Sequence, residues 1–276
     1  MARWSPPTSG AANSKGNWKN CSEPLPLALH FASDLHLGAP DAEASRDRER
    51  AFLKWIEEVG SQGDGLHLVG DLIDFWFEWR HVVPKGGVRL LGCIADLVDG
   101  GLDVHWHLGN HDMWTKGYLA DELGVQVHAE PIDVQYAGFH CLVGHGDGLG
   151  PGDRKYKALK RLFRNPAARW AFARIHPNLA FQLGSKLSRN SRNSGKEAEA
   201  HYTGPEGEWL FQHCRDVLER QPYDVFIFGH RHLPLDLEVT TEDGNRKARY
   251  LNCGDWIDHR TYVSLDENGP QLKTWS

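Results

Sequence analysis

The sequence predicts an α/β protein whose polar residues collect at the ends of its strands. Two observations lead to this prediction. Short apolar runs of strand length alternate with segments that place apolar residues at helical spacing. Five of the runs end in a small residue followed by a carboxylate, amide or imidazole. Open α/β sheets build their sites in this way, beyond the carboxyl ends of the strands.

Composition indicates an ordinary globular chain. Its 276 residues are 40% hydrophobic and 25% charged, which is enough to bury a full core. No run approaches the roughly 18 apolar residues of a membrane span, and the first thirty residues lack a signal peptide's apolar segment. We therefore expect a cytoplasmic protein with a disordered leader over residues 1–24 and one elaborated domain over residues 25–276. The five cysteines show no zinc or redox spacing and are expected to be reduced.

The first strand and helix are predicted close to the amino terminus. Residues 25–32 form a short apolar run, and Asp34 and His36 follow it two apart, on one side of the chain. Residues 46–59 then carry apolar side chains at the spacing of an amphipathic helix.

The same order repeats twice more. Residues 66–69 and 102–108 read as strands, and residues 88–98 read as the helix between them. The polar residues that follow these two strands are Asp71, Asn110, His111 and Asp112.

Two further strands end in histidines. Residues 139–143 lead to His145, and residues 224–228 lead to His230 and His232. Glycine precedes both endings, and it permits the sharp turn and the close ligand approach that a side chain would block. Arg231, between the last two histidines, is expected to point away from the site.

The polar residues at the five strand ends form a coherent ligand set. Singly, each has a simpler explanation as a helix cap, a turn former or a core histidine. Together they offer mixed oxygen and imidazole donors, which suit Mn, Fe or Zn. With a bridging Asp71, seven residues suffice for two ions, and two ions about 3.5–4 Å apart favour hydrolysis at phosphorus. The set is Asp34, His36, Asp71, Asn110, His145, His230 and His232.

One segment of the chain is strongly cationic. Residues 154–196 contain twelve Lys and Arg and no Asp or Glu. Apolar residues recur there at helical spacing, as in a basic amphipathic helix pair that lies on a membrane surface. Ordinary helix packing and a nucleic-acid patch are the alternatives.

The strand-end motifs resemble those of the calcineurin-like metallophosphoesterases over about residues 27–265. These motifs are Asp34-x-His36, Gly70-Asp71, Gly109-Asn110-His111-Asp112, Gly144-His145 and Gly229-His230-x-His232. The resemblance implies two packed mixed β-sheets flanked by helices. It also implies that Asp34, His36 and His232 hold one ion, that Asn110, His145 and His230 hold the other, and that Asp71 lies between them.

A narrower resemblance is to the UDP-2,3-diacylglucosamine hydrolases of lipid A biosynthesis, in the branch typical of Bacteroidetes. It depends on Asp71-Leu-Ile-Asp74-Phe75-Trp76, the run from His145 to Asp153, and Phe163-Arg164-Asn165-Pro166. It implies attack of a metal-activated water on the α-phosphorus of UDP-2,3-diacylglucosamine, which releases UMP and 2,3-diacylglucosamine 1-phosphate (lipid X). Two Mn²⁺ ions are the implied cofactors, with Fe, Zn or Mg as alternatives.

The same resemblance implies a helical cap over residues 153–203 and a set of substrate contacts. The contacts are Asn110, His111, Asp153, Ser191, Asn193, Lys196 and His230, with Ser188 as an alternative to Ser191. His111 departs from the proteobacterial branch, which has Arg after the motif Asn. With Asp112 it resembles the His-Asp pair of the wider superfamily, which stabilises the transition state or protonates the leaving group.

These resemblances imply a lipid-linked nucleotide-sugar substrate and peripheral contact with the cytoplasmic face of the inner membrane. No nucleic acid and no protein partner is expected. One alternative is a calcineurin-like phosphodiesterase or phosphatase that acts on nucleotides or another phosphoester. Another is a non-catalytic scaffold that has lost its metal. Residues 252–256 are expected to lie near the site without acting as ligands.

Overall fold

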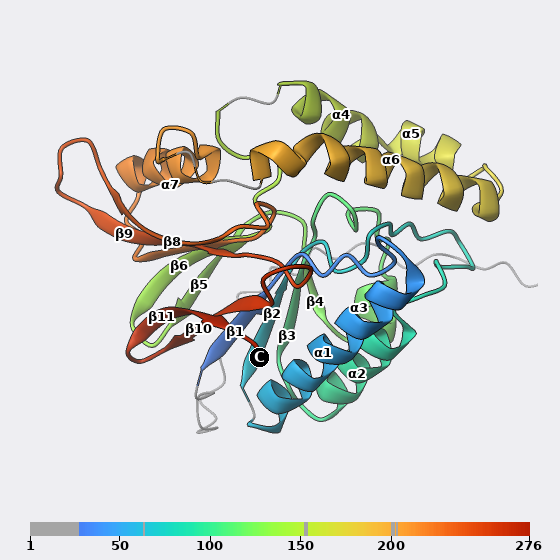
Figure 1. Ribbon diagram of the computed structural model, residues 1–276, viewed down its shortest axis with the longest axis horizontal. Helices are drawn as coiled ribbons and strands as arrows, with labels where there is room; N and C mark the ends of the chain where they lie inside the picture. Colours follow the sequence, from blue (N-terminus) through green and yellow to red (C-terminus); the bar gives the residue numbers. More distant parts are fainter. Residues whose placement is uncertain (1–27, 63, 152–153, 200–201, 203) are drawn as a thin grey trace, which may run out of the picture.

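The computed structural model describes residues 28–62, 64–151, 154–199, 202 and 204–276 (Figure 1). The expected leader, residues 1–24, lies outside this range. Over the described ranges the chain forms two mixed β-sheets with helices on their outer faces and a helical cap above (Figure 1). The predicted α/β class, the two packed sheets and the cap insertion are confirmed.

The first sheet has six strands within the described residues, in the order β11-β10-β1-β2-β3-β4. Strands β1 to β4 are parallel, and β10 and β11 add antiparallel strands at one edge. The bounds are β1 Leu29–Ala32, β2 Gly65–Val69, β3 Val104–His107, β4 Gln126–His128, β10 Thr261–Asp266 and β11 Gly269–Thr274.

The second sheet has the order β5-β6-β7-β9-β8, counted over the same described ranges. Its centre, β6, β7 and β9, is parallel, and both edges are antiparallel. The bounds are β5 Ile132–Tyr136, β6 Phe139–Gly144, β7 Val225–Phe228, β8 Pro234–Thr240 and β9 Lys247–Cys253. The inner faces of the two sheets share one apolar cluster, in which Phe31 and Val69 of the first sheet meet Val143 and Ile227 of the second.

Helices cover the outer face of each sheet. Helices α1 (Ala42–Ser61), α2 (Val88–Asp99) and α3 (Tyr118–Leu123) pack on the first sheet, and α7 (Trp209–Arg220) packs on the second. Helix α1 forms because Phe52, Trp55, Ile56 and Val59 fall on one buried face. Asp41 caps this helix by accepting hydrogen bonds from the N–H groups of Glu43 and Ala44.

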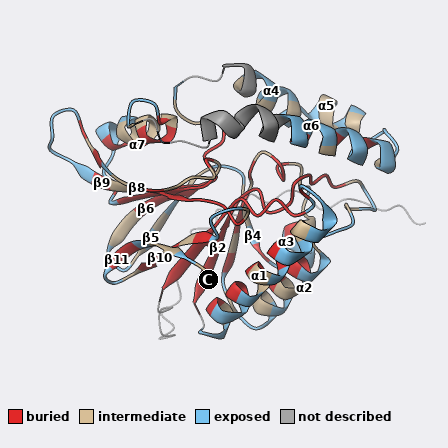
Figure 2. Ribbon diagram, viewed as in Figure 1, coloured by how far each residue is buried: buried red, intermediate tan, exposed pale blue. Residues whose placement is uncertain are grey.

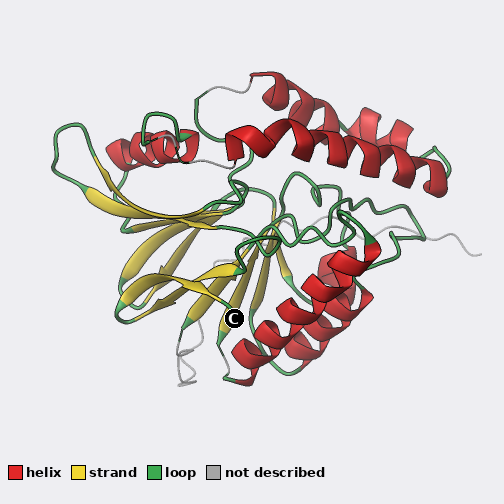
Figure 3. Ribbon diagram, viewed as in Figure 1, coloured by secondary structure: helices red, strands yellow, loops and turns green. Residues whose placement is uncertain are grey.

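The cap consists of α4 (Arg154–Arg164), α5 (Pro166–Phe172) and α6 (Pro177–Glu199). It lies above the loops at the carboxyl ends of the parallel strands (Figure 3). Those loops are largely buried between the sheets and the cap (Figure 2). The cap therefore lies over the region where the sequence places its polar residues.

Helix α6 meets the body of the protein at two positions one turn apart. A Cβ added at Gly184 would lie 2.2 Å from the ring of Phe75, so only glycine permits this approach. At Ser188 the hydroxyl donates a hydrogen bond of 2.9 Å to the carbonyl oxygen of Asp74. The cap is thus held directly against the 74–75 segment, beside the strand ends.

Among the helices of the described ranges there is no candidate for a membrane span. None combines the length and the apolar character that crossing a bilayer requires.

Candidate metal centre

The first group of predicted ligands lies at the ends of β1 and β7. Nε2 of His232 lies 3.2 Å from Oδ1 of Asp34 and 3.2 Å from Nε2 of His36. Within the described part of the chain, no donor forms a hydrogen bond to the buried Oδ1 of Asp34. Three lone-pair atoms converge here, and a divalent cation at their centre would satisfy all of them.

The second group lies at the ends of β2, β3, β6 and β7. Nε2 of His145 lies 3.3 Å from Oδ2 of Asp71 and 3.3 Å from Oδ1 of Asn110. His230 places a ring nitrogen within 4.8 Å of the ligand atoms of Asp71 and His145. The side chains of Asn110, His230 and His232 are only half-buried, so the site is open on their side.

Asp71 lies between the two groups. Its Oδ2 is 3.8 Å from Nε2 of His36 in the first group and 3.3 Å from Nε2 of His145 in the second. The structure therefore brings together all seven residues that the sequence singled out. The paired His and Asp clusters indicate a site for two metal ions.

The backbone of this centre is unusual. Over the described ranges, seven non-glycine residues have positive φ, and five of them belong to the predicted ligand set. These are Asp34 (φ 56°), His36 (44°), Asp71 (55°), His230 (67°) and His232 (55°). Non-glycine residues adopt this left-handed conformation at a cost of about 1–2 kcal/mol each, and such residues concentrate at functional sites.

Two glycines allow the loops to approach one another. A Cβ at Gly109 would lie 2.1 Å from Oδ1 of Asp71, and a Cβ at Gly229 would lie 2.6 Å from Oγ of Ser33. Each glycine precedes a predicted ligand, Asn110 or His230. The glycine pattern at the strand ends thus has a steric reason in this chain.

Outer contacts orient the imidazoles. Nδ1 of His145 donates to the carbonyl oxygen of Val69 at 2.8 Å. Nδ1 of His36 lies 3.4 Å from Oδ1 of Asp74, and Nδ1 of His232 lies 3.5 Å from Oδ2 of Asp255. Partners at Nδ1 fix the ring orientation and leave Nε2 directed at the centre, as in many metal sites. Residues 252–256, expected near the site, contribute through Asp255.

Charge pairing shapes the acid–base properties of the centre. Burial alone would lower the pKa of His145, but the Asp71 carboxylate outweighs it and raises that pKa to about 10. Burial would raise the pKa of Asp34, but the imidazoles of His232 and His36 hold it well below its usual range. Burial and the neighbouring His145 lower the pKa of His230 to about 4. The Asp34 carboxylate therefore stays ionised, as a ligand to a cation must be.

His111 faces the centre from the third strand end. Its Nδ1 donates to the carbonyl oxygen of Asp74 at 2.7 Å and lies 2.9 Å from Oγ of Ser188. Its Nε2 is 3.8 Å from Oδ2 of Asp71. Burial lowers the pKa of His111. Ser188 of the cap thus contacts a predicted catalytic residue.

Asp112 lies beneath the same loop and is fully buried. Its carboxylate accepts hydrogen bonds from the N–H of Gly109 at 2.6 Å and the indole N–H of Trp106 at 3.2 Å. Burial, and then the charge of Asp71, raise its pKa to about 7. These contacts hold the turn that carries Asn110.

Arg231 points away from the centre, as its position between two ligands suggested. Its Nε donates to Oε2 of Glu208 at 2.8 Å, and its guanidinium lies 4.7 Å from the ring centroid of Trp209. Both charged groups of this pair are buried. The pair fixes the loop that carries His230 and His232 to the start of α7.

Beside the centre lies an apolar cavity of about 540 Å³ under the cap. Asn110 and His111 form its polar end. Its apolar walls come from both the body and the cap: Phe75, Phe77, Met113, Trp114, Leu159, Leu162, Phe163, Phe172, Leu183 and Leu187. Sequence analysis predicted apolar residues in the cap but could not show that they enclose a cavity with Trp114 and Phe77.

Four of the predicted substrate residues cannot be placed in this site. Asp153 lies outside the described residues. The side chains of Ser191, Asn193 and Lys196 also lie outside them, although the backbone at these positions belongs to α6.

A second histidine group lies on the first sheet, outside the predicted ligand set. We call His67, His105, His107 and His128 the histidine ladder. Nδ1 of His67 lies 3.1 Å from Nε2 of His107, and Nδ1 of His105 lies 2.9 Å from Nε2 of His128. The rings of His67 and His105 are stacked at 4.3 Å. The sequence analysis did not identify this group, because it depends on the pairing of β2, β3 and β4.

Comparison with curated proteins gives long matches. A protein from Porphyromonas gingivalis named UDP-2,3-diacylglucosamine hydrolase is 36% identical over 250 residues, covering 86% of this chain and 94% of that protein. One of the same name from Stutzerimonas stutzeri is 29% identical over 241 residues, covering 86% and 94%. No family model matches the chain. Among solved structures, a phosphoesterase from E. coli is 16% identical with a TM-score of 0.44, covering 90% of this chain and 93% of that one.

Proposed function

Since the chain belongs to the UDP-2,3-diacylglucosamine hydrolase family, we propose that it hydrolyses the pyrophosphate bond of UDP-2,3-diacylglucosamine in lipid A biosynthesis. The products are UMP and 2,3-diacylglucosamine 1-phosphate. The observation that supports this substrate best is the apolar cavity, which opens onto the metal centre at Asn110 and His111. A site for hydrolysis at phosphorus beside an apolar cavity suits a substrate in which a diphosphate is linked to a lipid.

The metal centre would hold two Mn²⁺ ions. Asp34, His36 and His232 would bind one ion, Asn110, His145 and His230 the other, and Asp71 both. When bound, such ions lower the pKa of a water and neutralise charge on the phosphoryl oxygens. Oxygen and imidazole donors without thiolate suit Mn²⁺, with Fe, Zn and Mg as alternatives.

Two residues would assist the reaction in different ways. His111 has Nε2 free to face the substrate, because its Nδ1 is committed to the carbonyl of Asp74. It would stabilise the phosphoryl charge or pass a proton to the leaving oxygen. We assign Asp112 to positioning instead of substrate contact, because it is fully buried and supports the backbone of Gly109.

Substrate binding involves the cap. Asn110, His111 and His230 would contact the phosphates, while Asp153, Ser191, Asn193 and Lys196 would contact the sugar phosphate. Leu183 and Leu187 of α6 are exposed by 46% each and line the apolar cavity. They would shelter the acyl chains after the chains leave the bilayer.

The outer cap surface would contact the cytoplasmic face of the inner membrane. Trp170 and Leu179 are 62% and 61% exposed. Cations lie among them, and the guanidinium of Arg174 is 4.8 Å from the ring centroid of Trp170. Exposed apolar residues among cations favour binding to anionic lipid surfaces.

Two cap variants test separately the binding of the acyl chains and the contact with the membrane. Leu187→Asn should reduce turnover of UDP-2,3-diacylglucosamine in detergent at least about tenfold, because burying a polar amide against acyl chains is costly. It should leave Mn²⁺-dependent hydrolysis of bis(p-nitrophenyl) phosphate intact. Leu179→Asn should give the converse result, with normal turnover in detergent and weaker sedimentation with anionic vesicles.

Mass spectrometry of the products identifies the bond that is cleaved. UMP together with the sugar 1-phosphate supports the proposal, and UDP-N-acetylglucosamine serves as the substrate without acyl chains. Equal turnover of both substrates would refute lipid specificity and favour a nucleotide phosphodiesterase.

A further inference from the structure

A second cleft lies on the other side of Phe75 from the apolar cavity. We propose that it binds the uridine half of the substrate, with the Glu49 carboxylate accepting hydrogen bonds from the ribose hydroxyls. This inference rests on the proposed function, and it assigns a separate subsite to each half of the substrate.

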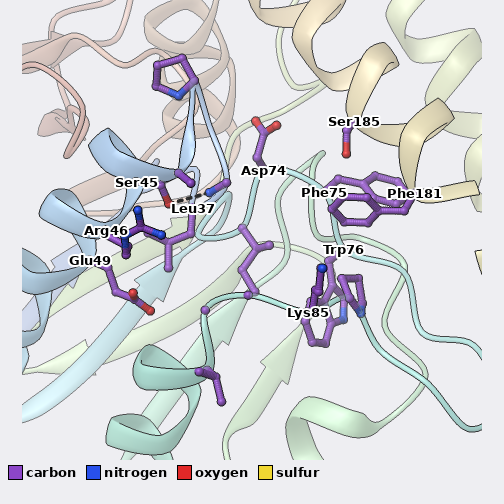
Figure 4. Close-up of a pocket in the computed structure, with 18 of the residues that line it drawn as sticks. Leu37, Ser45, Arg46, Glu49, Asp74, Phe75, Trp76, Lys85, Phe181 and Ser185 are labelled. Atoms are coloured by element: carbon purple, nitrogen blue, oxygen red, sulfur yellow. Dashed lines mark hydrogen bonds between the residues drawn. The ribbon is translucent and has the colours of Figure 1, made fainter. Parts of the chain in front are cut away.

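The cleft has a volume of about 880 Å³, and the described residues that line it come from α1, the start of α2, α6 and the loops at residues 37–40, 73–76 and 84–87. Helix α1 contributes Arg46 and Glu49, the loop before α2 contributes Lys85, and α6 contributes Ser185 and others. Figure 4 shows Glu49 and Arg46 on one side of this cleft, and Trp76 and Lys85 on the other. The volume falls within the usual range for small-ligand sites, roughly 300–1,000 Å³.

The charge of the cleft differs from that of the apolar cavity. Five cationic side chains line the cleft: Arg46, Lys85, Arg89, Lys186 and Arg189. Its acidic lining residues are Glu49 and Asp74. Of the described residues that line the apolar cavity, only Arg169 is a lysine or an arginine. The cationic side chains of the cleft attract an anionic nucleotide.

Glu49 is the residue of the cleft that indicates a hydrogen-bonding ligand. Glu49 is 8% exposed, and among the described residues its buried Oε1 has no hydrogen-bond partner. A buried acceptor without a donor is costly, and a carboxylate can only accept. The side chain lines the cleft, so a ligand there is the natural source of the missing donor.

A nucleoside supplies suitable donors. The two adjacent ribose hydroxyls can donate to the two oxygens of one carboxylate, as they do to the acidic residue of dinucleotide-binding sites. Uracil itself carries one donor, the N3–H. The ribose therefore matches Glu49 better than the base does.

The cleft adjoins the metal centre at Asp74. Asp74 and Phe75 line both the cleft and the apolar cavity, and Oδ1 of Asp74 is 3.4 Å from Nδ1 of His36. On α1, the residue next to Glu49 is Arg48, which donates to the carbonyl oxygens of Leu35 and His36 at 2.6 and 2.9 Å. Glu49 is thus fixed relative to the metal ligands, and in this proposal the diphosphate would extend from the metal centre toward the cleft.

Calorimetric binding of UMP to the Mn²⁺-loaded protein tests the inference. Glu49→Gln keeps the size of the side chain but removes its charge, and should weaken UMP binding about 10- to 100-fold. Glu57→Gln, an exposed position on the same helix, should bind UMP as the unmodified protein does. Unchanged affinity in Glu49→Gln, with metal content equal to that of the unmodified protein, would overturn the inference.

Two analogues locate the contact within the nucleotide. The unmodified protein should bind 2′-deoxy-UMP at least about tenfold more weakly than UMP, and Glu49→Gln should lose this discrimination. If Glu49 caused weaker binding of 3-methyl-UMP but not of 2′-deoxy-UMP, the ribose assignment would be overturned. Binding assays separate this inference from the proposed function. If Glu49→Gln and the unmodified protein bind UMP equally and the unmodified protein hydrolyses the lipid substrate normally, only the subsite is refuted. Glu49-dependent UMP binding without hydrolysis of UDP-2,3-diacylglucosamine refutes only the proposed reaction.

Discussion

The metal centre and the histidine ladder are both clusters of imidazoles on the same scaffold, but they have opposite electrostatic properties. In the metal centre, His145 packs against the Asp71 carboxylate, which raises its pKa to about 10. In the ladder, burial and then neighbouring imidazoles lower the pKa of His67 and His107 well below the usual value.

Carboxylates account for this difference. The centre has two buried carboxylates, Asp34 and Asp71, among its imidazoles. The ladder has Asp103 at its exposed end, 3.3 Å from Nε2 of His105. Clustered histidines therefore form a site for cations only where buried negative charge accompanies them; without it, they pack as neutral rings.

Removing the central negative charge should have the largest effect. Asp71→Asn keeps the shape of the side chain but takes away the charge shared by both ion positions. We expect loss of both Mn²⁺ ions and at least about a 10³-fold fall in kcat, because each ion would lose a charged ligand. Elemental analysis and phosphodiesterase kinetics measure this.

The ladder supplies the matched control for that variant. Asp103→Asn should leave metal content and kcat unchanged. If Asp71→Asn kept two ions and substantial activity, buried charge would not be what separates the two histidine groups.

A steric change should have an intermediate effect. In Gly109→Ala the new methyl group would lie 2.1 Å from Oδ1 of Asp71 and displace the carboxylate. We expect about a 10²-fold fall in kcat, since small misplacement of catalytic groups costs this much, and weaker Mn²⁺ binding by calorimetry. Gly92→Ala, where the methyl group would meet nothing within 4 Å, should retain full activity. Equal kinetics in the two variants would contradict the proposed tight approach.

The ladder should make a smaller contribution, visible as pH-dependent stability. The pKa of His107 is lowered in the folded state by burial, so below about pH 6.5 the unfolded chain binds a proton that the folded chain does not. Stability should therefore fall with acid by about 1.4 kcal/mol per pH unit for each such histidine, until the folded pKa is reached.

His107→Gln removes one titrating group and should reduce this acid dependence by about 1–2 kcal/mol between pH 7 and pH 5. Urea denaturation at several pH values measures it. His81→Gln, at an exposed position, should match the unmodified protein. A steeper acid dependence in His107→Gln would mean that the ladder is protonated in the folded state.

The strand ends were predictable because each depends on a local pattern. An apolar run followed by glycine and a polar residue predicts where Asp71 or His145 lies without reference to any distant residue. The Asp255 contact with His232 and the Glu208 contact with Arg231 span 23 residues each. Such partners follow from sheet pairing and loop packing, which no single stretch of sequence specifies.

The two cavities were also not predictable from the sequence, because they too depend on contacts between distant segments. Apolar residues at helical spacing were predicted in the cap, but Trp114 and Phe77 complete the cavity from loops far away in the sequence. Glu49 appeared only as a polar residue of an amphipathic helix. It lines a cleft only because α6 and the loop before α2 form the other walls, and the sequence alone gives no sign of that arrangement.

The left-handed backbone of the ligand residues has a consequence for protein engineering. A metal-free binding scaffold built on this fold would keep five strained positions with no ion to compensate for them. Alanine substitution would remove the ligands but leave the strain. Glycine at Asp34, His36, Asp71, His230 and His232 would relieve it, because glycine adopts positive φ without a steric cost.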